Sequence, residues 1–525
     1  MGCVLLACLF HSCEDKCVNP FRDLSLDSLE RLKEQAFALN SQAIRSHLRR
    51  LAKMDADSMI PDYRLRQYYA NESPFLWIDR NGLDTRADTL LHYLDNVAKM
   101  GFSERKFAIP QIREDLERIR TLNMESKGDT LDINLMMARL EYNMTKAYLR
   151  YSVGQRFGFS NPTYLLNRID EKDPSRRTPY DTTHYEKLFD IAIEHPTNAF
   201  YHTALHKVSA DSVGEFMQDI QPKDSLYERL LARINNDSIG MDERNKLICN
   251  LERCRWRMRD FMERPAKYVL VNIPAFQLYA HDGDSTLSMR VVCGKYNTKT
   301  PLLVSKVKRM DINPRWFIPK SIVEKEVVHH AGNRRWFESH RYFIRHRKTG
   351  KRIEPERVSW GMLMSGDYLV AQEGGPGNSL GRIIFRFDNP FSVFLHDTSS
   401  PGVFGRDNRG ASHGCVRVQK PFDLAVYMLH KKDETTIDKI QYSMTADVSK
   451  KGKQYQIDPE TGEEVELEDT LDRKRLIGTI DVKPEVPLLI TYFTVFPDEK
   501  GNLREYKDVY GYDRVIAHHL KNYRD

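Results

Sequence analysis

The chain has 525 residues, of which 41% are hydrophobic and 29% are charged, and its formal net charge is +6. This composition is typical of a globular chain of two or three domains and argues against an intrinsically disordered one. The sequence contains no run of about 18 apolar residues, so no membrane-spanning helix is expected. The excess of positive charge is small, and neither a zinc finger nor an RNA-binding motif accompanies it. Nucleic acid is therefore not an expected partner.

The first 17 residues contain four of the eight cysteines, a distribution that does not fit a disulfide framework. Leu5-Leu6-Ala7-Cys8 resembles a lipobox, in which the cysteine is lipidated, and Cys13 is a second candidate for lipidation. We therefore interpret residues 1–20 as an export or lipoprotein signal, although no basic residue precedes the apolar run. The alternatives are an apolar N-terminus without a signal function and N-myristoylation at Gly2.

From residue 24 to residue 265 the apolar residues recur with the spacing of a helix face. The pattern is clearest over residues 88–101, 140–158 and 250–261, and the first of these ends at a glycine. No internal repeat or low-complexity tract interrupts the region. An all-helical domain is therefore predicted over residues 24–265.

The pattern changes at Pro265, after which short β-rich runs replace the helical spacing. The predicted strands are 267–273, 276–280, 383–387, 391–396 and 487–495. One helix is predicted over 421–431, where Pro421 occupies the first position and its missing N–H has no cost. A mainly β domain is therefore expected over residues 266–525, which makes the chain an α+β multidomain protein.

Two polar segments interrupt the β domain. Residues 324–357 carry ten Lys or Arg against five Glu, and residues 449–475 contain the turn signal Asp458-Pro-Glu-Thr-Gly462. We interpret 449–475 as a polar surface insertion. For 324–357, a solvated insertion and a lid or substrate-binding segment both remain open.

The stretch GASHGCVRV (410–418) places Cys415 among small residues, 19 positions after His396. His396 ends a predicted strand, and the glycine-rich loop that follows is long enough to bring the chain back to it. An imidazole beside the sulfur would favour the thiolate, which is the nucleophilic form of cysteine. The spacing therefore suggests a cysteine nucleophile with His396 as its base, although a buried structural cysteine remains the alternative.

The neighbours of Cys415 suit the same chemistry. Gly414 lets backbone N–H groups approach a developing oxyanion, and Arg417 is suited to a substrate carboxylate. His413 would orient the loop or contact the substrate carbonyl. A zinc ion held by His396, His413 and Cys415 is a third interpretation, but no CxxC or HExxH motif accompanies them, and no metal is expected.

The run from His396 to Ser412-His413-Gly414-Cys415-Val416-Arg417 resembles the signature of L,D-transpeptidases with a YkuD-type catalytic domain. Other stretches resemble the large periplasmic subgroup of these enzymes: 75–83, 140–151, 250–256, 268–279, 312–322, 375–381, 490–503 and 508–513. The resemblance implies a helical scaffold domain (24–265) and a YkuD-like catalytic domain (266–525) with a capping insertion at 324–360. It departs from the subgroup because no peptidoglycan-binding module fits within residues 233–249.

The resemblance implies an enzyme of the periplasm or cell envelope that processes peptidoglycan stem peptides. The Cys415 thiolate would attack the bond between the third-position diamino acid and the fourth-position D-alanine. The amine of a second stem would accept the acyl group, giving a 3→3 cross-link. His396 would act as general base, oriented by a carbonyl near Asp397, and the N–H groups of Gly414 and Cys415 would form the oxyanion hole. Carbapenems would acylate Cys415.

The resemblance also names Ser412 and His413 as parts of the catalytic motif, and Arg417, Asn378 and Trp316 as substrate-binding candidates. No cofactor is expected, a membrane tether would come from the N-terminal lipid, and a monomer is expected. An L,D-carboxypeptidase, an L,D-endopeptidase, attachment or release of a wall-bound lipoprotein, and a non-catalytic wall-binding scaffold remain open.

Overall fold

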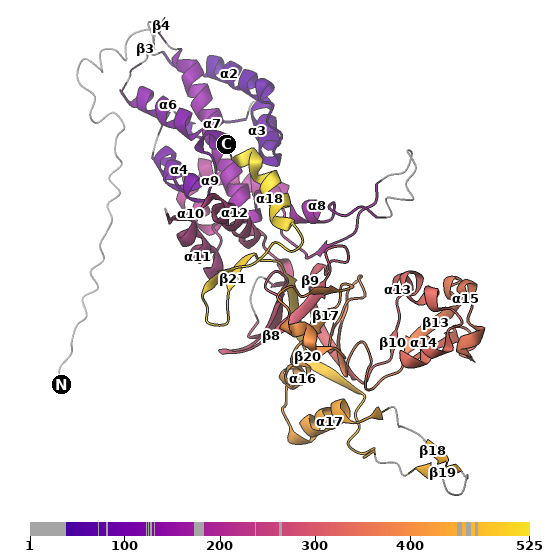
Figure 1. The fold of residues 1–525 in the computed structure, drawn as a ribbon. Coiled ribbons are helices and arrows are strands. Elements are labelled where there is room, and N and C mark those ends of the chain that lie inside the picture. Colours follow the sequence, from indigo (N-terminus) through magenta and orange to yellow (C-terminus); the bar gives the residue numbers. More distant parts are fainter. Residues whose placement is uncertain are drawn as a thin grey trace, which may run out of the picture. The chain divides into compact units, whose positions relative to one another are not determined.

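The computed structural model describes residues 38–524 except 72, 80–81, 84, 122, 124, 127–128, 131, 173–182, 237, 262–264, 449–453, 458–463 and 468–470. The chain forms two compact units (Figure 1). The helical unit takes in the described residues of Met1–Asn161, Glu194–Arg257 and Arg514–Asp525, and the strand-rich unit those of Pro162–Ile193 and Met258–Asp513. The segment predicted as a signal, with Cys8 and Cys13, lies outside the described residues.

This division differs from the predicted boundary at residue 265. Residues 162–193 lie within the predicted helical domain, yet they cluster with the strand-rich unit. They supply helix α8 (Pro162–Leu166) and strand β5 (Phe189–Asp190), and β5 pairs in parallel with strand β9 (Leu302–Ile312). A two-residue strand carries no periodicity, so only its partner reveals where it belongs.

Eight strands of the described part of the strand-rich unit form a closed barrel. In spatial order they are β14 (Ile383–Phe387), β15 (Leu395–His396), β17 (Val416–Val418), β8 (Ser285–Gly294), β7 (Gln277–Asp282), β6 (Lys267–Asn272), β20 (Thr479–Thr491) and β9. The pairing of β14 with β9 closes the ring and removes its edges. The predicted strands at 267–273, 276–280 and 383–387 are confirmed to within a few residues. The strand predicted at 487–495 is confirmed only in part, because β20 begins eight residues earlier, ends at Thr491, and is followed by the separate strand β21 (Val495–Pro497).

Shorter elements surround the barrel. β16 (Gly410–Ser412) runs parallel to β8, and β21 (Val495–Pro497) pairs with β22 (Leu503–Glu505). The predicted helix at 421–431 is α16 (Pro421–Met428), which α17 (Glu434–Thr445) follows. Within the predicted polar insertion, β18 (Gln454–Ile457) and β19 (Glu464–Leu467) form a hairpin.

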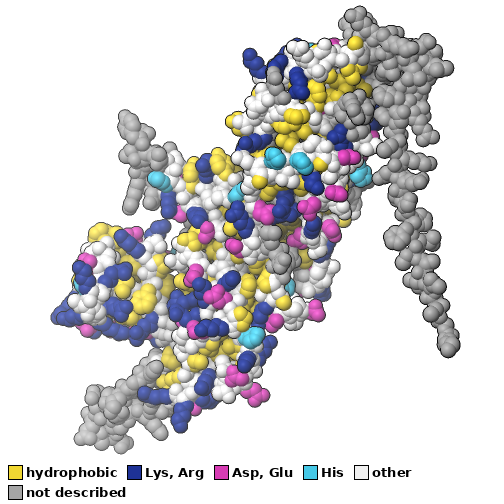
Figure 2. All heavy atoms as spheres, turned by 180° about the vertical axis from the view of Figure 1, so that it is seen from behind, with side chains coloured by type: hydrophobic (Ala, Val, Ile, Leu, Met, Phe, Trp, Pro, Cys, Tyr) yellow, Lys and Arg dark blue, Asp and Glu magenta, His cyan; other side chains and the backbone are white. Residues whose placement is uncertain are grey.

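A separate lobe, which we call the cap, interrupts the chain between β9 and β14. It is wider than the predicted insertion at 324–360 and spans residues 316–372, because two strands outside that range complete its sheet. The sheet order is β10 (Trp316–Phe317), β13 (Tyr368–Gln372), β11 (Tyr342–His346) and β12 (Arg352–Ile353), all antiparallel. Helices α13 (Lys320–Lys325), α14 (Arg334–Ser339) and α15 (Trp360–Met364) accompany it. Lys and Arg side chains gather on this lobe, at the left of Figure 2.

The helical unit is built around α7 (Ile133–Phe157), against which α2, α3, α4, α6, α9 and α12 pack. α7 is buried on nearly all sides, as expected for a helix at the centre of a bundle. The other helices are α2 (Ser41–Met54), α3 (Ile60–Ala70), α4 (Arg86–Leu94), α5 (Asn96–Lys99), α6 (Ile109–Thr121), α9 (Asn198–Ser209), α10 (Val213–Asp219), α11 (Ser225–Ile234), α12 (Met241–Arg255) and α18 (Tyr512–Leu520). The hairpins β1–β2 (Ile78–Asp79, Gly82–Leu83) and β3–β4 (Glu125–Ser126, Asp129–Thr130) complete the unit. None of the described helices combines the length and the apolar character that crossing a bilayer requires.

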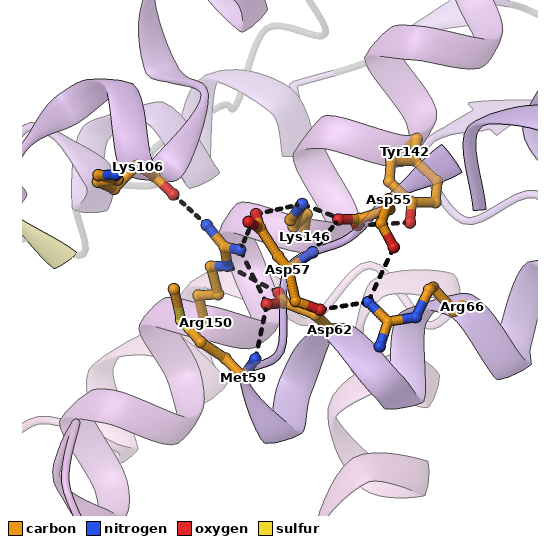
Figure 3. Close-up of polar contacts among 9 residues, drawn as sticks. All are labelled: Asp55, Asp57, Met59, Asp62, Arg66, Lys106, Tyr142, Lys146 and Arg150. Carbon is orange, nitrogen blue, oxygen red and sulfur yellow. Dashed lines mark hydrogen bonds and ion pairs between the residues drawn. The ribbon is translucent and has the colours of Figure 1, made fainter. Parts of the chain in front are cut away.

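An ion-pair network lies beside α7, with Arg150 and Asp62 buried and Asp57 about half exposed (Figure 3). The guanidinium of Arg150, 3% exposed, lies 2.7 Å from Asp62 and 2.6 Å from Asp57, while Lys146 contacts Asp57 at 2.8 Å and Asp55 at 2.7 Å. Burial alone would raise the pKa of Asp57, but Lys146 and Arg150 lower it to about 2. The network ties α7 to the α2–α3 connection with every charge partnered, as a buried charge requires.

Candidate active site

The parallel pairing of β15 with β17 sets the geometry of the site. Its register places His396 beside Arg417. Neighbouring residues of parallel strands point to the same face, and residues two apart on one strand do so as well. Cys415, which directly precedes β17, therefore shares a face with Arg417 and with His396. This brings together the three side chains that the sequence singled out.

The predicted strand 391–396 is wrong in its first part, because only Leu395–His396 is a strand. The residues before Leu395 form a turn instead. The Asn389 side chain stabilises this turn by accepting hydrogen bonds from the N–H groups of Phe391 (3.0 Å) and Val393 (3.1 Å). Ser392 adopts the left-handed region with φ of 55°. The turn directs the Ser392 carbonyl toward Cys415, whose Sγ lies 4.0 Å from it.

His396 is 4% exposed, and its Nδ1 lies 2.5 Å from the backbone oxygen of Asp397. Since a carbonyl only accepts, Nδ1 carries the proton and Nε2 keeps its lone pair. Burial, and next the positive charge of Arg417, lower the pKa of His396 to about 4, against the opposing effect of backbone hydrogen bonds with Asp397 and Leu380. At neutral pH the imidazole is therefore an uncharged base with a fixed tautomer.

Cys415 is also neutral at rest. Burial raises the pKa of its thiol, and the opposing effects of a Phe394 backbone hydrogen bond and the Arg417 charge do not reverse this. The sequence analysis favoured a thiolate at Cys415 beside His396. The raised pKa of the thiol and the lowered pKa of the imidazole both disfavour such a thiolate–imidazolium pair. The thiol must lose its proton as it attacks, and a neutral His396 is the appropriate acceptor.

The loop that carries Cys415 is held from within by Ser412. Its Oγ donates to the Cys415 oxygen at 2.6 Å and accepts from the Gly414 N–H at 3.1 Å. Gly414 has φ of +117°, a conformation that favours glycine. The predicted oxyanion hole needs one correction, because the Gly414 N–H is already used inside the loop. The Cys415 N–H has no hydrogen-bond partner among the described residues and remains the available donor.

The turn between β8 and β9 holds the same loop from outside, a role that the sequence did not reveal. The Thr300 hydroxyl donates to the Gly414 oxygen at 2.8 Å and accepts from the Gly294 N–H at 2.9 Å. Thr298 donates to the Ser412 oxygen at 3.0 Å. These hydroxyls lie more than 100 residues from the motif in sequence, so no local pattern could have identified them.

Comparison with known proteins supports the family. Residues 266–438 match the YkuD family, described as the L,D-transpeptidase catalytic domain, and residues 63–233 match the family described as the scaffold domain. The chain carries a YkuD-type L,D-transpeptidase catalytic domain. A Haemophilus influenzae protein named "Putative L,D-transpeptidase" is 26% identical over 329 residues, which are 62% of this chain. The similarity spans 60% of that relative's length.

Within this YkuD-type domain, Arg417 has an unpaired donor near His396. It neighbours His396 across the strand pair, and its Nε is buried with no hydrogen-bond partner in the part of the chain that the structure describes. Burial lowers the pKa of the guanidinium. A donor that is buried and unpaired is costly, so a carboxylate that reached it would be stabilised.

Asn378 has a structural role in place of the predicted substrate contact. It is fully buried, and its amide nitrogen donates to the oxygens of Pro314 (3.2 Å) and Glu373 (2.9 Å). Its oxygen accepts from the Leu380 N–H at 2.8 Å. Because all of these polar contacts are internal, Asn378 shapes the loop before β14. The resemblance to the subgroup suggested Asn378 as a substrate-binding candidate, but its polar atoms are used inside the loop.

His413 and Trp316 both relate to the cap. The His413 side chain is 44% exposed, and its Nε2 lies 3.2 Å from Glu326 Oε1. Trp316 is partly buried against the hydrophobic core of the cap, with its ring 6.5 Å from that of Tyr342. The structure thus places His413 at a contact with the cap and Trp316 within the cap. No group of three or more His, Cys, Asp or Glu that could hold a metal occurs among the described residues.

Proposed function

We propose that this protein is a peptidoglycan L,D-transpeptidase of the cell envelope, which a lipid on Cys8 or Cys13 would tether. The family match at 266–438 supports the reaction class. One observation carries the assignment of residues. The β15–β17 register joins His396, Arg417 and Cys415 on one face, with the His396 tautomer fixed by the Asp397 oxygen.

The reaction uses these groups in two stages. Cys415 Sγ attacks the carbonyl of the third-position diamino acid while His396 Nε2 takes the thiol proton. The Cys415 N–H stabilises the oxyanion, and Arg417 pairs with a carboxylate of the stem. His396 then returns the proton to the departing D-Ala amine, which leaves a thioester. The side-chain amine of a second stem attacks the thioester, and His396 accepts its proton and passes it to the departing Cys415 sulfur, so that a 3→3 cross-link forms and the neutral thiol is restored.

Intact-protein mass spectrometry with a purified disaccharide tetrapeptide tests the proposal. The expected result is a thioester mapped to Cys415, D-Ala release, and a dimer joined through two third-position residues. Incubation with a carbapenem should likewise give a covalent adduct on Cys415. Cys415→Ala should abolish both, whereas Cys254→Ala, a half-buried cysteine of the helical unit, should change neither.

The products also separate the alternatives. Tripeptide as the sole product would identify water as the acceptor and make the protein an L,D-carboxypeptidase. A folded protein that gives neither adduct nor D-Ala would refute the enzymatic assignment and favour a wall-binding scaffold.

A further inference from the structure

The cap sheet is covered on one face only. Its hydrophobic core contains Ile344 of β11 and Val370 of β13, and α14 and α15 pack on that side. Side chains alternate along a strand, so Phe343 and Arg345 of β11 and Leu369 of β13 point to the opposite face. We call this opposite side the open face of the cap. Among the described elements, no helix or strand packs substantially against it.

Phenylalanines and arginines lie together on the open face. The register places Phe317 and Phe343 on either side of Ala371, and Arg345 opposite Arg352. The Arg352 guanidinium lies 4.1 Å from the Phe343 ring centroid, and that of Arg345 lies 5.3 Å from the Phe317 ring centroid. Phe317 is 46% exposed, which is unusual for so large an apolar side chain. Aromatic rings interleaved with guanidinium groups present a flat surface that is both apolar and cationic.

The charge of the open face is unbalanced. Glu373, which follows β13, pairs with Arg315 at 3.0 Å and with Arg352. Arg345 has no ion-pair partner among the described residues. Arg315, Arg345 and Arg352 thus outnumber the carboxylate of Glu373 on this face, within the basic lobe seen in Figure 2. This surplus favours an anionic partner.

A pocket of about 530 Å³ lies at the inner end of the open face, where the cap joins the barrel. Arg315 and Glu373 line both the face and the pocket, together with Asn313 and Arg341. The Asn313 Oδ1 is buried with no hydrogen-bond partner in the described part of the chain. A pocket of this size accommodates a small ligand or one unit of a polymer, and the orphaned oxygen offers an acceptor to a hydroxyl or amide donor.

We propose that the open face and this pocket bind the glycan strand of peptidoglycan, with its carboxylate-bearing stems. The inference rests on the proposed function, which supplies the polymer. Pyranose rings present flat C–H faces to Phe317 and Phe343, carboxylates pair with Arg345 and its neighbours, and the pocket takes one unit of the chain. Charge complementarity and the apolar–cationic mixture favour this occupant over a neutral polymer.

The open face is separate from the site of chemistry. Glu326, at the end of α13, contacts His413 of the catalytic motif, so the helical layer of the cap supplies the contact with the Cys415 loop. The open face lies on the other side of the cap sheet from that layer. It therefore holds the polymer away from the reacting bond and supplies the binding that a module, which does not fit within residues 233–249, would otherwise give.

Cosedimentation with purified sacculi tests the proposal, in the full-length Cys415→Ala background, which prevents turnover. The test variants are Arg345→Glu and Phe343→Ala. Arg335→Glu is the matched control, since it makes the same charge change on α14, on the covered side of the sheet. Loss of these contacts should weaken sacculus binding about tenfold in each test variant and by less than about twofold in the control. With Cys415 intact, the control Arg335→Glu should release D-Ala from the soluble disaccharide tetrapeptide at the parent rate.

Three results would overturn the proposal. The first is sacculus binding that Arg345→Glu leaves unchanged, and the second is an equal loss in Arg335→Glu, which would reduce the effect to general cationic attraction. The third is Arg345-dependent binding of equal-part phosphatidylglycerol and phosphatidylethanolamine vesicles without binding of sacculi, which would assign the face to a membrane. Failure of D-Ala release in the unmodified protein would instead refute the proposed function, while the sedimentation result would still report on the face.

Discussion

The depressed pKa of His396 predicts an acid limit of activity that is unusual for an imidazole base. With a pKa of about 4, roughly 90% of His396 is neutral at pH 5, whereas an unperturbed imidazole of pKa 6.5 would be about 3% neutral. The rate at pH 5 should therefore be about 30-fold higher than an ordinary histidine would allow, a difference of about 2 kcal/mol.

The direction of the pH dependence follows from the protonation state of His396 that is active. The base must be neutral, so kcat/KM should be level from pH 7 to pH 5 and fall as the pH passes through about 4. The assay is kcat/KM for D-Ala release from the disaccharide tetrapeptide, because this quantity reports pKa values of the free enzyme. Activity that returns after transfer from pH 4 to pH 7 would show that the loss is titration and not unfolding.

Arg417→Gln tests the cause of the shift. Burial is the larger cause of the lowered pKa and remains in this variant. The pH at which kcat/KM falls on the acid side of the profile, its acid limb, should therefore move only part of the way from about 4 toward 6.5. Arg406→Gln, an exposed arginine of the same unit, should leave the limb in place. An acid limb near 6.5 in the unmodified protein would refute the buried-base argument. If the pH profile of Arg417→Gln is identical to that of the parent, the Arg417 charge is not a cause of the lowered pKa of His396.

Three further predictions concern groups that hold the structure in place. Thr300→Val should leave the Gly414 oxygen without its hydrogen bond, which should lower the stability measured from the denaturation midpoint by about 1–3 kcal/mol. Acylation of Cys415 should also be slower, and an unchanged acylation rate would contradict the supporting role of Thr300. Arg150→Leu should leave Asp62 as an unpaired buried charge and destabilise the helical unit by about 3–5 kcal/mol in urea titrations, and a loss under about 1 kcal/mol would refute the buried network. Glu141→Ala should expose the N–H groups of three consecutive residues at 76–78 to exchange, which hydrogen–deuterium exchange would show as faster labelling confined to that turn.

The part of the site around Cys415 could be predicted from the sequence because the residues that form it are close together in the chain. The spacing of His396 and Cys415, with Ser412, His413 and Gly414 before the sulfur, depends on one turn and one strand pair. Strands such as IIFRF at 383–387 were predictable because a short run of β-branched and aromatic residues is typical of a buried strand. Helix α7 was predicted from residue 140 and begins at residue 133, since its amphipathic pattern weakens where it is buried all round.

The rest depends on partners that are distant in sequence. Thr300 acts on a loop 114 residues away, and nothing near it marks it as important. The cap sheet pairs Trp316 and Phe317 with residues 371–372, and a two-residue strand has no period to read. Asn378 was a candidate through the resemblance alone, and the sequence could not show that the backbone of Pro314, Glu373 and Leu380 takes up its amide.

The position of β20 in the barrel has a consequence for the order of assembly. Thr479–Thr491 lies between β6 and β9, so the strands that begin the catalytic domain stay unpaired on that side until residues about 200 positions later have been synthesised. The region matched by the family ends at 438, before this strand. A fragment cut at that point would expose two open strand edges and is expected to aggregate. Closure over such a sequence separation also predicts slow folding, limited by the entropy of bringing distant segments together.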